Sequence, residues 1–243
     1  MYRYILENAN DWCYFYGVNN SPEPHNIYHF PTIAEKIFPG VTNDSLKIIN
    51  GDLVNSPMSF PENRIVFLST GGSECYAQTI YQLGHELCHV YISANMVDVH
   101  LRPNMFWFEE VICEISSHLF LNQYMKDIGW NNDVNSLPYD QYSQLMFSDE
   151  YVEPFNTQNL SMAYSDEIEY FKNNSTDRKK NRYVAKLLMP IFLENPSLLS
   201  EARKLRNLYS ISDFQIFLDA WEDSTNAEYK STIQNIKECL SAQ

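Results

Sequence analysis

Two long segments with helical periodicity constrain the fold of this chain more than any other feature of its sequence. One extends over residues 73–95, and the other over residues 106–128, where Gly129 ends it. In both segments apolar residues recur at the spacing that places them on one face of an α-helix. Helices of this length bury that face against other elements, so the sequence predicts a largely helical body.

The N-terminal part of the chain carries the signals of a small sheet. Residues 65–69 are rich in β-branched and aromatic side chains, precede a Gly-Gly pair, and are expected to form a strand. Another short apolar run occupies residues 46–49. The chain has seven glycines, too few for the many tight turns of an all-β protein. We therefore expect an α+β fold, predominantly helical, with a small N-terminal sheet and a helical C-terminal region.

The C-terminal half is expected to form a series of helices. Pro190 should kink or shorten one of them, because proline lacks the backbone N–H that a helix uses. Residues 131–142 (NNDVNSLPYDQY) have the composition of a loop, so a division into regions 1–130 and 131–243 is natural, although one continuous domain is also possible. The expected helices span residues 158–172, 180–194, 196–208, 213–222 and 227–240.

Composition excludes several classes of function. The formal net charge of −14 argues against a nucleic-acid binder and against a protein that binds anionic membranes. No apolar stretch approaches the roughly 20 residues that cross a bilayer, and the first residues do not resemble a signal peptide. The five cysteines are widely spread and odd in number, which is typical of reduced thiols. The cytoplasm is therefore the expected location.

A short motif in the first long segment carries specific chemistry. Residues 85–89 read HELCH, an HExxH motif. Residues four apart on a helix differ by about 40° around its axis, so the imidazoles of His85 and His89 can reach one metal ion. Glu86 lies beside them and could accept a proton from a metal-bound water. The apolar residues of this helix project from its other side, so the His/Glu face is expected to border a cleft.

The second long segment offers a third metal ligand. A catalytic zinc usually has three protein ligands and leaves one position for water. On the helix expected at residues 106–128, Glu110 and Glu114 lie opposite an apolar side. Glu109 points about 100° away from Glu110, which makes Glu110 the better ligand and Glu109 a solvated charge. Glu114 either holds the second nitrogen of a ligand imidazole or is a partly exposed helix acid.

These two helices together resemble those of the gluzincin metallopeptidases, whose HExxH helix is followed by a helix that carries a ligand glutamate. The resemblance rests on HELCH and on WFEEVICE at residues 107–114, and it covers residues 64–125. It implies a zincin-like arrangement in which His85, His89 and Glu110 bind one Zn²⁺ and Glu86 is the general base. It also implies that Glu114 holds a ligand imidazole, in place of the aspartate often found there.

The resemblance has two further implications. Gluzincins bind peptide substrates beside the strand that precedes the HExxH helix, by strand addition. They also use a tyrosine or histidine beyond the third ligand to stabilise the oxyanion. The candidates here are Tyr183 and Tyr164, with Tyr139 and Tyr142 behind them, although a single tyrosine is more often a core or surface residue. The resemblance therefore implies that the N-terminal sheet has an edge strand there, formed by Ile65, Val66, Phe67, Leu68 and Ser69.

Asp177 is a rival for the third ligand position. Residues 177–190, which end in Leu-Leu-Met-Pro, faintly resemble a stretch of the small regulatory metalloproteases that act on phage-type repressors. In those proteins an acid before this helix completes the metal site. Arg182 could bind a substrate carboxylate, but it is expected to be a surface cation. The other side chains with metal-binding chemistry are expected to have structural roles. These side chains are His25, His29, His118, Cys88 and Cys113.

The sequence thus predicts a zinc metallopeptidase with one zinc ion per chain and a peptide or protein substrate, without a nucleic-acid or membrane partner. Two alternatives remain, a zinc hydrolase of a non-peptide amide and a regulatory or binding protein with a structural zinc. The intact Glu86 favours catalysis, because a purely structural site needs no base beside the metal. The substrate, the choice between endo- and exopeptidase and the oligomeric state stay open.

Overall fold

The structure is a computed structural model, and its contacts divide the chain into two units. The first comprises Met1–Asn95 and Ser116–Gln144, and the second comprises Met96–Ile115 and Leu145–Gln243. The division expected after residue 130 differs from this one, because the first half of the second long helix packs with the C-terminal region. The residues that the structure describes are 2–17, 25–51, 54–70, 75–93, 104–128, 139–161 and 165–241.

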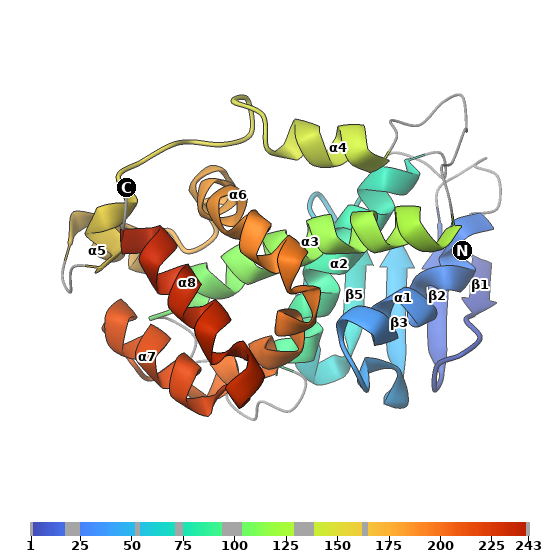
Figure 1. The fold of residues 1–243 in the computed structure, drawn as a ribbon. Coiled ribbons are helices and arrows are strands. Elements are labelled where there is room, and N and C mark those ends of the chain that lie inside the picture. Colours follow the sequence, from blue (N-terminus) through green and yellow to red (C-terminus); the bar gives the residue numbers. More distant parts are fainter. Residues whose placement is uncertain are drawn as a thin grey trace. The chain divides into compact units, whose positions relative to one another are not determined.

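The first unit contains a five-stranded mixed sheet with the strand order β1-β2-β3-β5-β4. Three of these strands, β2, β3 and β5, run parallel to one another, and β1 and β4 close the two ends by antiparallel pairing (Figure 1). Their inward-facing side chains, such as Ile48 and Val66, are fully buried. The strands are β1 (Tyr2–Ile5), β2 (Trp12–Tyr16), β3 (Leu46–Asn50), β4 (Met58–Phe60) and β5 (Ile65–Leu68).

Strand β5 lies inside the sheet, so the expectation of an edge strand at residues 65–69 is wrong. It pairs with β3 on one side and with β4 on the other. The short turn Pro61–Asn63 returns the chain and places the three-residue strand β4 against β5. Beyond β5, the side-chain amide of Gln82 bonds to both the backbone N and O of Ser69, each at 2.9 Å. The backbone N–H and C=O groups of this segment therefore already form hydrogen bonds within the protein.

The helices of the first unit include both expected long helices. The first is α2 (Tyr76–Ser93), which packs against β4 and β5, and the second is α3 (Phe106–Ile128), whose C-terminal half belongs to this unit. Two shorter helices, α1 (Phe30–Ile37) and α4 (Tyr139–Met146), complete it. Helix α4 begins within the segment that was expected to be a loop, because eight residues of low hydropathy give only a weak helical signal.

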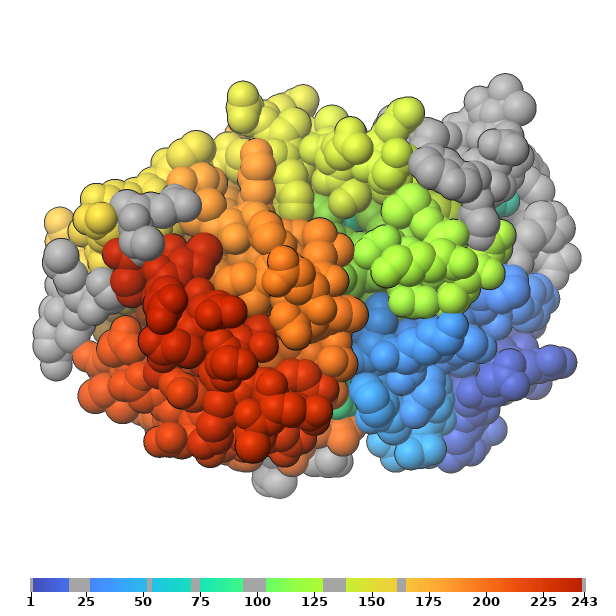
Figure 2. Space-filling model, viewed as in Figure 1, coloured from blue at the N-terminus to red at the C-terminus, as the bar shows by residue number. Residues whose placement is uncertain are grey.

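The second unit is helical and packs around aromatic side chains. The ring of Trp107 stacks on Phe171 at 4.6 Å between centroids and contacts Phe214 at 4.8 Å. Helix α8 lies at the surface beside α6 (red and orange in Figure 2). The helices, besides the first half of α3, are α5 (Asp166–Asn173), α6 (Arg178–Glu194), α7 (Phe214–Ser224) and α8 (Lys230–Ser241), with a 3₁₀ segment at Pro196–Asn207.

The observed elements confirm the predicted class, an α+β fold that is predominantly helical with its sheet near the N-terminus. Helix α6 continues through Pro190 to Glu194, so the proline does not shorten it. The helix expected at residues 158–172 is instead a 3₁₀ turn, Thr157–Ser161, followed by α5. Among the described helices, none is long and apolar enough to cross a membrane.

Candidate metal centre

The HELCH motif lies in the middle of α2, where helical geometry brings its two histidines together. The rings of His85 and His89 have centroids 5.1 Å apart and are inclined by 70°. Both side chains are buried, with 6% and 5% of their surface exposed. The polar face of α2 is therefore as deeply covered as its apolar face. Burial on both faces is unusual for a helix that carries charged groups, and it calls for polar partners.

Helix α3 crosses α2 at a close contact next to the motif. Gly84, the residue before His85, allows this contact, because a Cβ atom there would lie 2.9 Å from the Cβ and Cγ of Phe120. The hydroxyl of Ser116 donates a hydrogen bond of 2.8 Å to the carbonyl of Gly84. Glu110 lies six residues before Ser116 on the same continuous helix.

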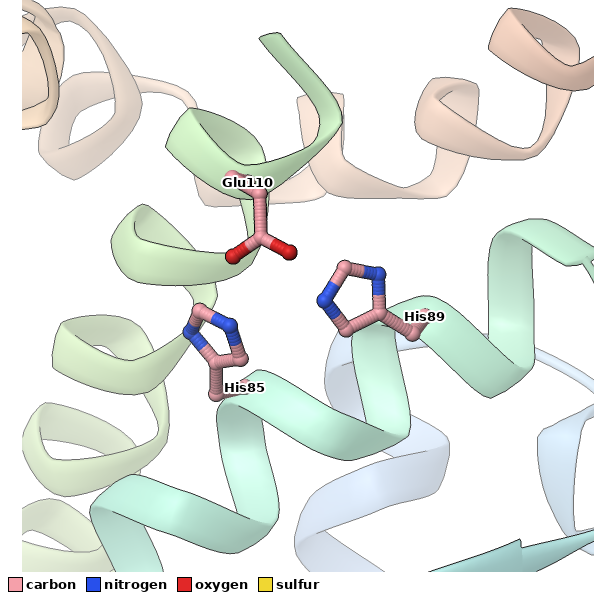
Figure 3. Close-up of side chains that lie close together, drawn as sticks. All are labelled: His85, His89 and Glu110. Carbon is pink, nitrogen blue, oxygen red and sulfur yellow. The ribbon is translucent and has the colours of Figure 1, made fainter. Parts of the chain in front are cut away.

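The side chains of His85, His89 and Glu110 point toward one another (Figure 3). One donor atom from each lies within 4.8 Å of the others, and Glu110 is only 7% exposed. Donors around a tetrahedral zinc lie about 3.4 Å apart, so small side-chain rotations would complete the coordination. Two imidazoles and one carboxylate form a donor set that suits Zn²⁺ and leaves a fourth position for water. The residues thus fit a catalytic zinc ion.

The buried charges near this cluster are unbalanced. Glu86, Glu109, Glu110 and Glu114 have exposed fractions of 3%, 1%, 7% and 3%. Arg182 is the only lysine or arginine among the residues that the structure describes as buried. Four carboxylates with one guanidinium would leave a large negative charge in a medium that solvates it poorly. A bound divalent cation would offset two of these three net negative charges.

Glu114 has a partner that the sequence did not predict. The Nε of Arg182, on α6, donates to Glu114 Oε1 in a short ion pair. The side chain of Arg182 is 9% exposed, so the expectation of a surface cation is wrong. The guanidinium also lies 5.7 Å from the ring centroid of Tyr151. Whether Glu114 also holds a ligand imidazole stays a prediction, since one of its oxygens is bound by Arg182.

Glu109 is buried, which corrects the expectation that it is a solvated charge. The hydroxyl of Tyr209 donates a short hydrogen bond to Glu109 Oε2. Glu109 also belongs to a second group of donors, in which its carboxylate, His89 and Cys113 lie within 4.8 Å of one another. Sequence reasoning missed Tyr209, because no local pattern marks a residue that lies 100 positions away from its partner.

Asp177 serves as the N-cap of α6. Its carboxylate accepts hydrogen bonds from the backbone N of Lys179 and Lys180 at 3.1 and 3.2 Å and from the hydroxyl of Tyr170 at 2.6 Å. This last hydrogen bond raises the pKa of Tyr170 above its ordinary value. Asp177 belongs to neither donor cluster found in the described residues. A capping role accounts for this acid without a metal.

The proposed oxyanion residues have different positions. Tyr183 lies on α6 with its ring 5.5 Å from that of Phe155, and Tyr164 lies outside the described residues. The ring of Tyr139 packs beside Tyr124, and that of Tyr142 beside Tyr81. None of these four tyrosines is thereby assigned to the metal centre, and their catalytic role stays a prediction.

Other expected structural groups have mainly packing roles. His118 is buried, and its Nδ1 lies 2.6 Å from the hydroxyl of Ser143. Cys88 is fully buried within α2. His29 packs its ring against that of Tyr124. Of the sequence candidates, the structure thus brings together His85, His89 and Glu110, and in addition it places Glu109 and Cys113 beside His89.

Comparisons of the chain with protein-family models, with curated proteins and with solved structures find no match.

Proposed function

We propose that this chain is a zinc-dependent metallopeptidase in which His85, His89 and Glu110 bind the ion and Glu86 is the general base. The observation that carries the proposal is the convergence of two imidazoles and a carboxylate from two packed helices. The surplus of buried carboxylates supports it, because a divalent cation would offset part of their charge. The five free cysteines support a reducing compartment such as the cytoplasm.

In the proposed reaction the zinc ion activates the water and the carbonyl, and Glu86 transfers the proton. When bound, zinc lowers the pKa of its water ligand toward neutrality and polarises the scissile carbonyl. Glu86 would accept the proton of the attacking water and deliver it to the leaving amine. Glu110 and the two imidazoles would hold the ion throughout the reaction.

Glu86 differs from the other buried acids near the donor cluster in its described contacts. Within the part of the chain that the structure describes, its carboxylate makes no hydrogen bond or ion pair, whereas Glu109 is bound by Tyr209 and Glu114 by Arg182. A general base must be free to take up and release a proton. The lack of a fixed partner therefore favours Glu86 over its neighbours for this role.

An extended peptide substrate would bind at β4 rather than at β5. Strand addition requires a strand with unpaired backbone groups, and β5 is paired on both sides. Among the described strands, β4 (Met58–Phe60) ends the sheet beside β5, and β5 leads toward α2. The substrate strand expected at residues 65–69 is therefore replaced in this proposal by β4.

The decisive experiment measures metal content and peptidase activity in parallel. The purified 243-residue chain should contain about one zinc ion, as a three-ligand site predicts. Mass spectrometry of a peptide library would detect cleavage. The variant Glu86→Gln should keep its zinc and lose roughly 10²- to 10⁴-fold in rate, because only the proton transfer is removed. Glu62→Gln, at an exposed glutamate, is the matched control and should retain full activity.

Three outcomes would overturn the proposal. A protein that binds no zinc lacks the proposed centre, and a Glu86→Gln variant with parental activity lacks the proposed base. If zinc binds but no peptide in the library is cleaved, the ion serves a non-peptide hydrolase or a structural role instead.

A further inference from the structure

Helix α3 presents two parallel rows of metal-binding groups, of which the proposed function uses one. Glu110 and Glu114 form the first row, and Glu109 and Cys113 form the second, each with a spacing of four residues. Residues at this spacing lie about 40° apart around a helix, and neighbouring residues lie about 100° apart. Glu109 and Cys113 are almost completely buried, with 1% and 0% of their surface exposed. The second row therefore faces protein and not solvent.

His89 is shared by both rows. A ring nitrogen of His89 lies within 4.8 Å of donor atoms of Glu109 and Cys113, and a ring nitrogen of His89 lies within 4.8 Å of donor atoms of His85 and Glu110. An imidazole that binds one ion contributes a single nitrogen to it. The hydroxyl of Tyr209 bonds to Oε2 of Glu109 and so orients this carboxylate, the kind of support that metal ligands require. The second group of donors is thus built with its own supporting hydrogen bond.

We propose that His89, Glu109 and Cys113 form a second position for a thiophilic divalent cation such as Zn²⁺, Co²⁺ or Cd²⁺. Thiolate and imidazole are the donors that soft and borderline cations prefer. Binding deprotonates the thiol and releases the proton to solvent. One thiolate and one carboxylate then neutralise the cation, whereas His85, His89 and Glu110 leave it with a net positive charge. A neutral complex costs least to bury.

The two positions compete for His89, because each needs this imidazole as one of its three donors. A cation held by Cys113 and Glu109 takes this imidazole away from His85 and Glu110, which leaves two donors where a catalytic zinc needs three. Thiophilic cations would therefore inhibit the peptidase at concentrations that fill the second position. This regulatory consequence rests on the proposed function, whereas the binding of the cation does not.

Cobalt absorption tests the binding directly. Co²⁺ is added to the metal-stripped, reduced 243-residue chain. Cobalt bound to a thiolate shows a charge-transfer band that oxygen and nitrogen ligands do not give. In Glu110→Gln, which weakens the first position, we expect the thiolate band at about one equivalent of Co²⁺. The band should vanish in Cys113→Ser, which should still bind Co²⁺ through His85, His89 and Glu110. Cys88→Ser, at a buried thiol outside both groups, should keep the band.

The outcomes separate this inference from the proposed function. A thiolate band that requires Cys113 and not Cys88 supports the second position, whether or not the chain cleaves peptides. Absence of the band in Glu110→Gln at saturating Co²⁺ overturns the inference, and so does a band that survives in Cys113→Ser. The same preparations are compared by circular dichroism, so that a missing band is scored only in folded protein. Loss of Co²⁺ binding in Cys113→Ser would instead contradict the His85, His89 and Glu110 centre.

Discussion

The contact between α2 and α3 at Gly84 gives the sharpest prediction about the metal centre. In Gly84→Ala the new Cβ would lie 2.9 Å from both Cβ and Cγ of Phe120. Ordinary contacts of a Cβ lie between 3.4 and 4 Å, and neither atom of Phe120 is at the mobile end of its side chain. The substitution must therefore displace one helix from the other by about 0.5–1 Å, as in other overpacked cores.

This displacement should affect metal binding more than stability. Overpacking costs about 1–3 kcal/mol, and alanine recovers about 1 kcal/mol through its higher helix propensity. The net loss in unfolding free energy is then about 0–2 kcal/mol. Metal donors, by contrast, must keep their distances within about 0.2 Å, so a shift of α3 that carries Glu110 exceeds this tolerance. We expect zinc to bind at least roughly tenfold more weakly, as when the support of a ligand is lost.

Two measurements on each variant test this reasoning. Urea denaturation of the metal-stripped chain gives the unfolding free energy, and competition with a chelating dye gives the zinc dissociation constant. Ser116→Ala is the control, because it removes the hydrogen bond to Gly84 at a cost of about 1 kcal/mol and adds no atom. It should bind zinc like the parent. Parental zinc affinity in Gly84→Ala, or equal weakening in both variants, would refute the proposed link between helix spacing and metal binding.

Two further predictions concern residues of the second unit. Arg182→Met should lower the unfolding free energy by about 3–5 kcal/mol, because it leaves Glu114 buried without its cation. Urea denaturation should show this loss. The double variant Arg182→Met, Glu114→Gln should recover much of it. Asp177→Ala should lower the unfolding free energy by about 1 kcal/mol through loss of the α6 cap. Metal analysis after dialysis should find the parental zinc content. A lower zinc content would instead support Asp177 as the third ligand.

Local periodicity predicted the two helices of the proposed metal centre well. The expected boundaries at residues 106 and 128 agree with those of α3, and α2 falls within the expected segment. The spacing of His85 and His89 fixes their relation once the segment is helical. The proximity of Glu110 required only that the apolar faces of two consecutive helices share one core. These features follow from short-range geometry, which a single sequence contains.

Features set by distant partners could not be predicted in this way. The ion pair of Arg182 with Glu114 joins residues 68 positions apart, and nothing in either local pattern indicates the other. Likewise, β5 is an interior strand because of β4, whose three residues are too few to show a period of two. The burial of the polar face of α2 depends on which distant parts of the chain pack over it. Strand order, ion pairs and burial all arise from tertiary packing, which local periodicity does not contain.

The contacts of the four buried glutamates near the donor cluster bear on the choice between a catalytic and a structural centre. A site that only stabilises the fold gains by giving every buried carboxylate a partner, because an unpaired one costs free energy. Glu109 and Glu114 meet this condition through Tyr209 and Arg182, and the carboxylate of Glu110 lies within 4.8 Å of the imidazoles of His85 and His89. Glu86 does not meet this condition, within the described residues, although glutamine would have the same shape without the charge. Proteins keep such costly groups where activity needs them, so a free carboxylate beside a metal centre favours proton transfer over a structural role.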